Sequence, residues 1–315
     1  MSMGFLGDLA VDLTLHIDRY PREGDDGIAH TQTRSLGGSV VNTAIVARRL
    51  GAPARMFVRL GSDPDGKHSR AEMAAEGLDV TAVQWDDTEP TQTNVTIVTD
   101  GGQRTMFAYR GTSRRLTAPT AEQLEGVAQL HVSAYSLYEG EQRRTAGTVI
   151  EHIASRGGTV SVDIPAAPPD AALAALAALL PSVALIVGDA DDLERLAEAA
   201  HASGLDALAD TVVVKHGRTG CTVIAPGTHT TVPALAPTVI DTTGAGDAFT
   251  AALLVGRRAG LPLETAALLA NAAGGAATTV VGAGRSFPGL EVMHELLAAS
   301  AHPAAEGARR WLAER

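Results

Sequence analysis

The feature that most constrains this fold is a regular alternation of strand-like and helix-like segments from about residue 120 onward. Short β-branched runs such as TVSVDI (159–164) and TVVVKHG (211–217) follow amphipathic helical patterns such as 141–158 and 189–202. Strands that alternate with helices usually form parallel sheets, because each helix returns the chain to the same edge of the sheet. The alternation therefore predicts an α/β fold, in which a parallel sheet carries helices on both faces.

The first third of the chain departs from this rhythm. It contains the patterns of a helix, a strand and a second helix, which we expect at 39–51, 54–61 and 68–78. It also contains polar-alternating segments that no helix follows, at 27–35, 91–100 and 104–111. Gly101, Gly102 and Gln103 join the last two segments, which is typical of a hairpin. These segments predict a small separate sheet that covers a site as a lid.

Composition excludes several classes of protein. The net charge of -11 and the pI near 5.3 are unsuited to general binding of nucleic acid or anionic membranes. The single cysteine, Cys221, excludes an internal disulfide and a multi-cysteine zinc site, and we expect a plain buried thiol. The N-terminal segment lacks the basic region of a secretory signal, and Pro181 interrupts the uncharged stretch 171–188. We therefore expect a cytoplasmic protein with no nucleic-acid or membrane partner.

The stretch DTTGAGDAFTAALL, residues 241–254, carries the clearest chemistry. Gly244 and Gly246 allow backbone N–H groups to converge just before a helix, whose N-terminus favours an anion such as phosphate. Asp247 would then lie in the first helical turn, where it could accept a proton from a substrate hydroxyl. The spacing alone fits a helix cap equally well, with Asp247 serving only the helix dipole.

A second segment nearly matches a P-loop. Residues 61–68, GSDPDGKH, lack the final Ser or Thr that would bind magnesium, and His68 stands in its place. Asp63, Pro64 and Asp65 would lie inside the supposed phosphate cradle, and none of them suits an anion. We interpret the segment as a turn between a strand and a helix.

The segment SLGGSVVNTAIVARRLG, residues 35–51, suggests a binding site for a polyol. Gly38 permits close approach of the backbone to a ligand, and Asn42 is a polar residue in the first turns of an apolar helix. Asp12 stands at the end of an apolar strand, where it could accept paired sugar hydroxyls. Asn42 could instead be satisfied by backbone, and Asp12 could be a surface residue.

Together, in this order, the early pattern GG…N…A..L..LG and the late pattern DTTGAGDAF resemble the ribokinase family of carbohydrate kinases, also called the PfkB family. The resemblance spans nearly the whole chain. It implies a Rossmann-like, three-layer α/β/α kinase domain over 1–315, with lid strands from about 12–36 and 90–112. It also implies ATP-dependent phosphorylation of a sugar hydroxyl, with Mg²⁺.

The resemblance assigns roles to individual residues. Asp247 would be the general base, and the backbone of Gly244, Ala245 and Gly246 the anion hole. The substrate would contact Asp12, Gly38 and Asn42. On the nucleotide side, the matching residues are Lys215, Gly217, Gly220 and Asn271. Residues that match a monovalent-cation site, for example for K⁺, are Asp241, Thr243, Gly282 and Ser286.

One motif departs from the family. Many members carry Asn-x-x-Glu after a core strand, which helps organise magnesium and phosphate. Here Gly188 takes the Asn position and Asp191 the Glu position. We expect Asp191 to keep the magnesium function through water, with Asp189 as a neighbour that could compensate for the missing Asn.

Several alternatives stay open at this point. The same scaffold accepts nucleosides, although few aromatic residues are available to stack on a base. A sugar acid could pair with Arg104 and Arg110 on the lid hairpin, although we favour solvated charges on an edge strand for both. A non-catalytic sugar-binding relative is the alternative outside enzymes. Because the lid has unpaired strand edges, we expect a homodimer that forms through it.

Overall fold

A computed structural model describes residues 2–101, 103–235 and 237–315. Its main sheet has eight strands in the order β14-β13-β12-β11-β10-β9-β1-β4. The parallel strands are β1 (Ser2–Leu6), β4 (Ala54–Phe57), β9 (Val127–Ser133), β10 (Thr159–Asp163), β11 (Leu185–Asp189) and β12 (Thr211–Lys215). An antiparallel pair, β13 (Gly220–Ala225) and β14 (Thr228–Pro233), completes one edge. The predicted α/β fold is confirmed, with an antiparallel edge that the alternation did not predict.

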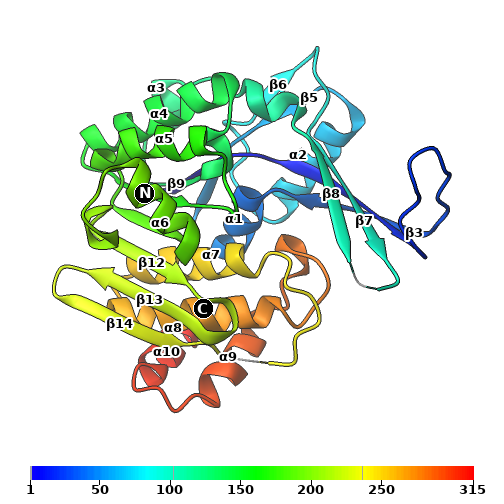
Figure 1. Ribbon diagram of the computed structural model, residues 1–315. Coiled ribbons are helices and arrows are strands. Elements are labelled where there is room, and N and C mark those ends of the chain that lie inside the picture. Colours follow the sequence, from blue (N-terminus) through cyan, green and yellow to red (C-terminus); the bar gives the residue numbers. More distant parts are fainter. Residues whose placement is uncertain (1, 102, 236) are drawn as a thin grey trace.

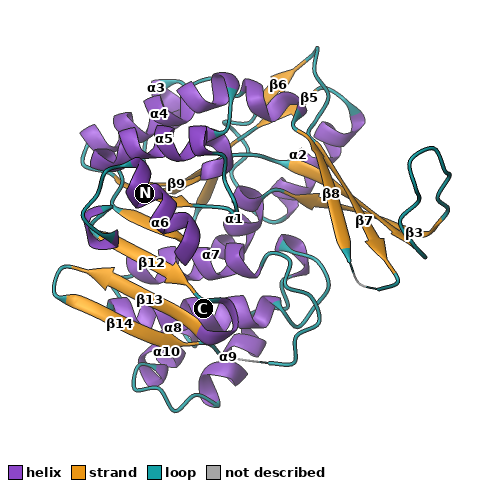
Figure 2. Ribbon diagram, viewed as in Figure 1, coloured by secondary structure: helices purple, strands orange, loops and turns teal. Residues whose placement is uncertain are grey.

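Helices cover both faces of this sheet (Figure 2). Successive residues of one strand belong to two separate hydrophobic clusters, Val213 to one and Val212 and Val214 to the other, because side chains alternate across a strand. One cluster involves α4 (Gly140–Ser155), α5 (Asp170–Leu179) and α6 (Ala190–Ala199). The other involves α1 (Ser39–Arg49), α7 (Ala245–Arg258), α8 (Leu263–Ala277), α9 (Leu290–Ala298) and α10 (Ala305–Leu312). The short helix α3 spans Ala121–Leu124.

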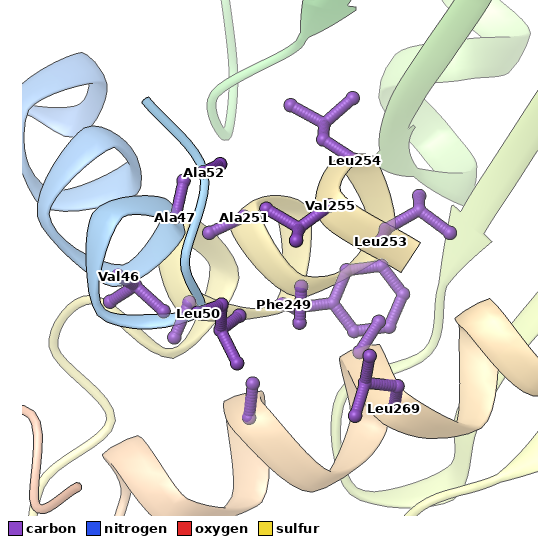
Figure 3. Packing of buried hydrophobic residues seen from close by; sticks show 14 of the residues in the cluster. Val46, Ala47, Leu50, Ala52, Phe249, Ala251, Leu253, Leu254, Val255 and Leu269 are labelled. Atoms are coloured by element: carbon purple, nitrogen blue, oxygen red, sulfur yellow. The ribbon is translucent and has the colours of Figure 1, made fainter. Parts of the chain in front are cut away.

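The second cluster fixes α1 against α7. Figure 3 shows side chains of α1 and its C-cap, of α7 and of α8 meeting between the helices, among them Leu50, Phe249 and Leu269. All three are at most 6% exposed, so the packing is a dry core. The first turns of α1 and α7, which carry the predicted site residues, are thereby held on one rigid body.

A four-stranded sheet, which we call the lid, projects to one side of the main body (Figure 1). Its strands are β2 (Ala10–Ile17), β3 (Ala29–Gly37), β7 (Thr93–Thr99) and β8 (Arg104–Tyr109), in the order β3-β2-β7-β8. The predicted separate sheet is therefore present, and β7 and β8 pair antiparallel. Gly102, in the predicted hairpin turn, lies outside the described residues.

Two predicted boundaries are wrong. The strand expected at 54–61 breaks at Val58, and its second part, β5 (Arg59–Gly61), pairs instead with β6 (Gln84–Asp86). The helix expected from residue 68 begins earlier, as α2 (Pro64–Ala75), because Asp63 caps it by accepting a hydrogen bond of 2.7 Å from Gly66 N. The P-loop-like segment is thus a strand-to-helix turn, as predicted.

Among the described residues, no helix has both the length and the apolar character needed to cross a bilayer.

Candidate active site

The turn before α7 is built so that only glycine fits at its start. Gly244 has φ of 74°, and a Cβ there would lie 2.4 Å from Ala283 Cβ. It is also the N-cap of α7, and no side chain caps the helix within the described residues. Residues 244–246, which we call the anion turn, lie at the positive end of α7, and Ala245 N donates to Thr242 O at 3.2 Å. The predicted anion hole is therefore at a helix N-terminus, with the N–H of Ala245 already bonded to the preceding loop.

Asp247 is held by the other helix of the pair. Ser39 Oγ donates to Asp247 Oδ1 at 2.7 Å, and Asn42 Nδ2 donates to Asp247 Oδ2 at 2.8 Å. Gly244, and not Asp247, is the N-cap of α7, and Asp247 lies in the first turn, where a carboxylate also suits the helix dipole. Burial raises the pKa of Asp247 to about 6, against the lowering effect of the two hydrogen bonds.

Asn42 lies in the first turns of α1, where the sequence placed it. Its side chain is turned to Asp247 rather than to backbone, and only 6% of the residue is exposed. Its Oδ1 is buried without a hydrogen-bond partner among the described residues. An unsatisfied buried acceptor beside a buried carboxylate is what a site for a hydroxyl-bearing ligand would contain.

Asp12 lies inside the lid strand β2 and not at the end of an apolar core strand, so that placement was wrong. Asn94, the residue paired with it on β7, donates to Asp12 Oδ1 at 2.8 Å. Burial raises the pKa of Asp12, although Asn94 partly offsets this. A Cβ at Gly37 would lie 2.0 Å from Asp12 Oδ2, so the glycine makes room for the carboxylate. Asp12 is thus a partly buried acceptor on the lid.

Gly38 links the lid to α1. Its φ is 101°, and a Cβ there would lie 2.4 Å from the carbonyl oxygen of Asp8. This close approach brings Ser39, at the start of α1, next to the loop that follows β1. Of the predicted substrate residues, Asn42 lies at Asp247, whereas Asp12 and Gly38 lie at the base of the lid.

A buried ionic cluster below the lid was missed from the sequence. Arg110 Nη2 donates to Asp8 Oδ2 at 3.1 Å, and Gln142 Nε2 donates to Asp8 Oδ1 at 2.6 Å. The Arg110 side chain is only 15% exposed, so its interpretation as a solvated edge charge was wrong. Arg104 is exposed as expected and donates to Thr243 Oγ1. A signal for Arg110 was its position at the end of the lid hairpin, beside the turn back to the core.

Tyr135 connects this cluster to Asp247. The strand β9 ends at Ser133, and a 3₁₀ turn, Ala134–Leu137, follows it. Burial, together with the nearby charges of Asp247, Asp8 and Asp163, raises the pKa of Tyr135. Tyr135, one of the few aromatic residues that the sequence offers for stacking on a base, therefore lies near Asp247.

Lys215 ends β12 close to the anion turn. Its Nζ donates to Asp163 Oδ1 at 3.2 Å, and a Cβ at Gly246 would lie 3.6 Å from that nitrogen. Gly217 has φ of 56° and Gly220 has φ of 109°, and a Cβ at Gly220 would lie 2.1 Å from Val232 O. Both glycines shape the predicted turn after β12.

The other predicted nucleotide residues are more scattered. Asn271 is buried in α8, where Nδ2 donates to Val232 O at 3.1 Å and to Pro233 O at 3.0 Å. Burial raises the pKa of the adjacent Cys221 to about 12, which fits the predicted inert thiol. Asp191 is exposed in the first turn of α6. Gly188 has little room for a side chain, because a Cβ there would lie 3.1 Å from Leu193 Cγ.

The four residues of the predicted cation site come together. Asp241 Oδ1 accepts hydrogen bonds from Thr243 N at 3.0 Å and Thr243 Oγ1 at 2.7 Å, and Oδ2 accepts one from Gly282 N at 2.9 Å. A Cβ at Gly282 would lie 3.0 Å from Ser286 Oγ. Burial disfavours the charged form of Asp241, but these hydrogen bonds outweigh it and lower its pKa.

Comparisons with known proteins agree with this geometry. The chain is 32% identical over 280 residues to a fructokinase of Klebsiella pneumoniae, covering 80% of this chain and 88% of that protein. It is 24% identical to a ribokinase of Haemophilus influenzae, covering 94% and 98%. The structure of an Arabidopsis thaliana ribokinase complexed with ribose and ATP has a TM-score of 0.80 at 24% identity, over 95% of this chain and 99% of that chain.

A nucleoside kinase of Methanocaldococcus jannaschii has the same fold, with a TM-score of 0.82 at 17% identity over 95% of this chain and 98% of that chain. The model of the pfkB family carbohydrate kinases matches residues 5–289. This match, together with the anion turn and Asp247, shows that the chain belongs to the pfkB family of carbohydrate kinases.

Proposed function

We propose that this protein transfers the γ-phosphoryl group of ATP to a hydroxyl of a small sugar, with Asp247 as the general base. The observation that carries the proposal is the position of the Asp247 carboxylate, which Ser39 and Asn42 hold directly beside the uncapped N-terminus of α7. A base and an anion site in contact are the two parts that phosphoryl transfer needs.

Different residues have different roles in the proposed phosphoryl transfer. Asp247 accepts the proton of the sugar hydroxyl, and a pKa of about 6 leaves it mostly ionised at neutral pH while keeping it basic enough to hold that proton. Ser39 and Asn42 fix its orientation. The N–H groups of the anion turn bind the oxygens of the phosphoryl group.

The nucleotide side fits a polyphosphate. Gly246 has no side chain that would come between the anion turn and the Lys215 ammonium, and a missing Cβ there leaves room for phosphate oxygens. ATP supplies the phosphoryl group, and Mg²⁺ offsets its charge. We propose that the nucleotide site is bordered by Gly217, Gly220 and Asn271. We propose further that Asp191 holds Mg²⁺ through water, with Asp189 beside it.

On the substrate side, we propose that Asp12, Gly38 and Asn42 contact the sugar. Asp12 and its partner Asn94 offer an acceptor and a donor on the lid, and Asn42 Oδ1 offers a buried acceptor near Asp247. Because the Klebsiella relative is named a fructokinase, fructose is the first sugar to test, followed by ribose.

The decisive experiment is a coupled assay of ADP release over pentoses, hexoses, sugar acids and nucleosides. We expect turnover with a ketohexose or pentose, and a loss of kcat of about 100- to 1,000-fold in Asp247→Asn. Turnover confined to nucleosides or sugar acids would replace the sugar with one of those classes. Tight sugar binding without any ADP release would make the protein a non-catalytic sugar binder.

We propose further that Asp241, Thr243, Gly282 and Ser286 surround a monovalent cation such as K⁺, next to the anion turn. The hydrogen bonds from Thr243 and Gly282 keep the Asp241 carboxylate ionised and fixed, which suits a cation. Replacing K⁺ with tetramethylammonium should lower kcat. Equal rates in both salts would remove the cation from the mechanism.

We also propose a homodimer that forms through the lid, in a cytoplasmic protein. Met106, Phe107 and Tyr109 on the edge strand β8 are each more than half exposed, as an apolar surface that a second copy would cover. Light scattering after gel filtration should give twice the chain mass of 32.4 kDa. A monomer at all concentrations would exclude the dimer.

A further inference from the structure

The ends of three neighbouring parallel strands place one lysine among three carboxylates. Asp163 ends β10, Asp189 ends β11, and Lys215 ends β12 in register with Asp189. Asp247 belongs to the same group of charges, because it also acts on the pKa of Lys215. Carboxyl ends of parallel strands are where ligands bind in α/β sheets, so this group of charges faces a ligand site.

Lys215 Nζ has a hydrogen-bond partner but also has donors that this partner does not use. Asp163 Oδ1 is the single hydrogen-bond acceptor recorded for Lys215 Nζ in the described part of the chain, at 3.2 Å. Thr250 Oγ1 donates to the other Asp163 oxygen at 3.1 Å, so the carboxylate is itself fixed. An ammonium group has three N–H bonds, which leaves two for other acceptors.

The ammonium group of Lys215 lies near the anion turn. A Cβ at Gly246 would be 3.6 Å from Nζ, which is within van der Waals contact, so Nζ lies close to this turn. The side chain is 19% exposed, so it is largely buried but open to a ligand. Burial alone would disfavour its charge, yet Asp163, Asp189 and Asp247 raise the pKa of Lys215, and it stays cationic at neutral pH.

The end of β11 has no polar side chain at position 188. Gly188 stands at the position of the Asn in the Asn-x-x-Glu motif, and its neighbour Leu193 leaves little space for a side chain there. A phosphate that enters this site meets the carboxylates of Asp163, Asp189 and Asp247. A fixed cation is needed to offset that repulsion.

We propose that Lys215 is a catalytic residue whose ammonium group binds the transferring phosphoryl group at the anion turn, with Asp163 as its positioning residue. This inference rests on the proposed kinase function. During transfer, the bond from the sugar oxygen to phosphorus forms and the bond from phosphorus to the leaving oxygen of ADP breaks. Asp247 takes the hydroxyl proton, while Lys215 keeps its protons and contributes only charge and hydrogen bonds.

Nucleotide binding tests this contact without turnover. Calorimetry with Mg²⁺ would compare the β,γ-imido analogue of ATP with ADP, for the wild type and Lys215→Met. Because ADP lacks the third phosphate, we expect the variant to lose about 10-fold or more in affinity for the analogue and less than about 3-fold for ADP. Equal losses for both nucleotides, or no loss for either, would overturn the proposal.

Two further variants separate the contact from folding. Lys215→Met leaves Asp163 buried without its cation, so Lys215→Met combined with Asp163→Asn removes both charges and should restore the melting temperature. The double variant should still fail to prefer the analogue over ADP. Lys215→Arg should retain that preference, since it keeps the charge. A double variant with wild-type preference would contradict the assignment.

Failure of the proposed role of Lys215 can be distinguished from failure of the proposed kinase function. If the wild type shows the preference that depends on Lys215 but phosphorylates no compound in the panel, the kinase proposal fails and the phosphate contact stands. If it phosphorylates a sugar and Lys215→Met keeps wild-type kcat and nucleotide affinities, the kinase stands and the role of Lys215 falls.

Discussion

Ser39 Oγ donates a hydrogen bond of 2.7 Å to Asp247 Oδ1, although 208 positions separate the two residues in the chain. Ser39 is the first residue of α1, and only Gly38 separates it from the lid strand β3. The lid is therefore joined directly to the helix that orients Asp247, the proposed general base. A change in the position of β3 would be transmitted to Ser39 and then to Asp247.

This contact predicts a pH dependence. Burial raises the pKa of Asp247 to about 6, and only its ionised form can accept the hydroxyl proton. The value of kcat/KM should be level above about pH 7 and should fall with a slope approaching tenfold per unit well below pH 6. Ser39→Ala removes a hydrogen bond that lowers the pKa, so the midpoint should move upward. Initial rates from about pH 5 to 8.5 would show this, and an unmoved midpoint would contradict it.

Asp247→Asn should lose most of its kcat without being less stable at neutral pH. Because the folded-state pKa lies above the usual 3.8, ionisation of Asp247 costs stability as the pH rises toward and through about 6. A neutral amide avoids this cost, and Asn42 can rotate its unpartnered Oδ1 to accept from that amide.

The expected gain from Asp247→Asn is about 1–3 kcal/mol near pH 7.5, and it should disappear near pH 4, where both proteins carry a neutral group. Thermal unfolding at the two pH values measures the difference. A variant that is less stable than the wild type at pH 7.5 would show that the charge itself holds α1 and α7 together.

The residues that could be predicted from sequence are those with a local signal. Strand and helix periodicity gave the parallel sheet, and the two glycines before Asp247 indicated the anion turn, because backbone conformation and a helix start depend on neighbours in the chain. Asp63 shows how local chemistry can still move a boundary. Its capping bond to Gly66 starts α2 four residues before the apolar pattern at His68.

The contacts that the sequence did not predict are long-range. Asp12 meets Asn94 only after β2 and β7 pair across 82 positions, and Arg110 meets Asp8 across 102. Lys215 and Asp163 come from different strands of the same sheet. The local sequence around each residue does not indicate its distant hydrogen-bond partner. A buried, paired side chain such as Arg110 was therefore predicted to be a solvated charge.

Gly37→Ala should weaken sugar binding through Asp12. The added Cβ would lie 2.0 Å from Asp12 Oδ2, so the carboxylate must move and lose its hydrogen bond from Asn94. We expect KM for the sugar to rise about 10-fold or more with a smaller change in KM for ATP. Gly101→Ala in the same lid is the matched control, since Thr99 Oγ1 at 3.9 Å is the nearest atom to its Cβ. Equal effects of both substitutions would exclude the role of Gly37.

Arg110→Met should destabilise the protein, because it leaves the carboxylate of Asp8 buried with only Gln142 as a donor from the cluster. Removing one partner of a buried ion pair typically costs about 3–5 kcal/mol, so the midpoint of urea unfolding should fall clearly. Arg110→Met combined with Asp8→Asn should recover part of the loss, since no unpaired charge stays buried. Arg104→Met, at the exposed first residue of the lid strand β8, should change stability by less than about 0.5 kcal/mol. If Arg110→Met and Arg104→Met unfold at the same urea concentration, the cluster contributes nothing and Arg110 is the solvated charge that the sequence suggested.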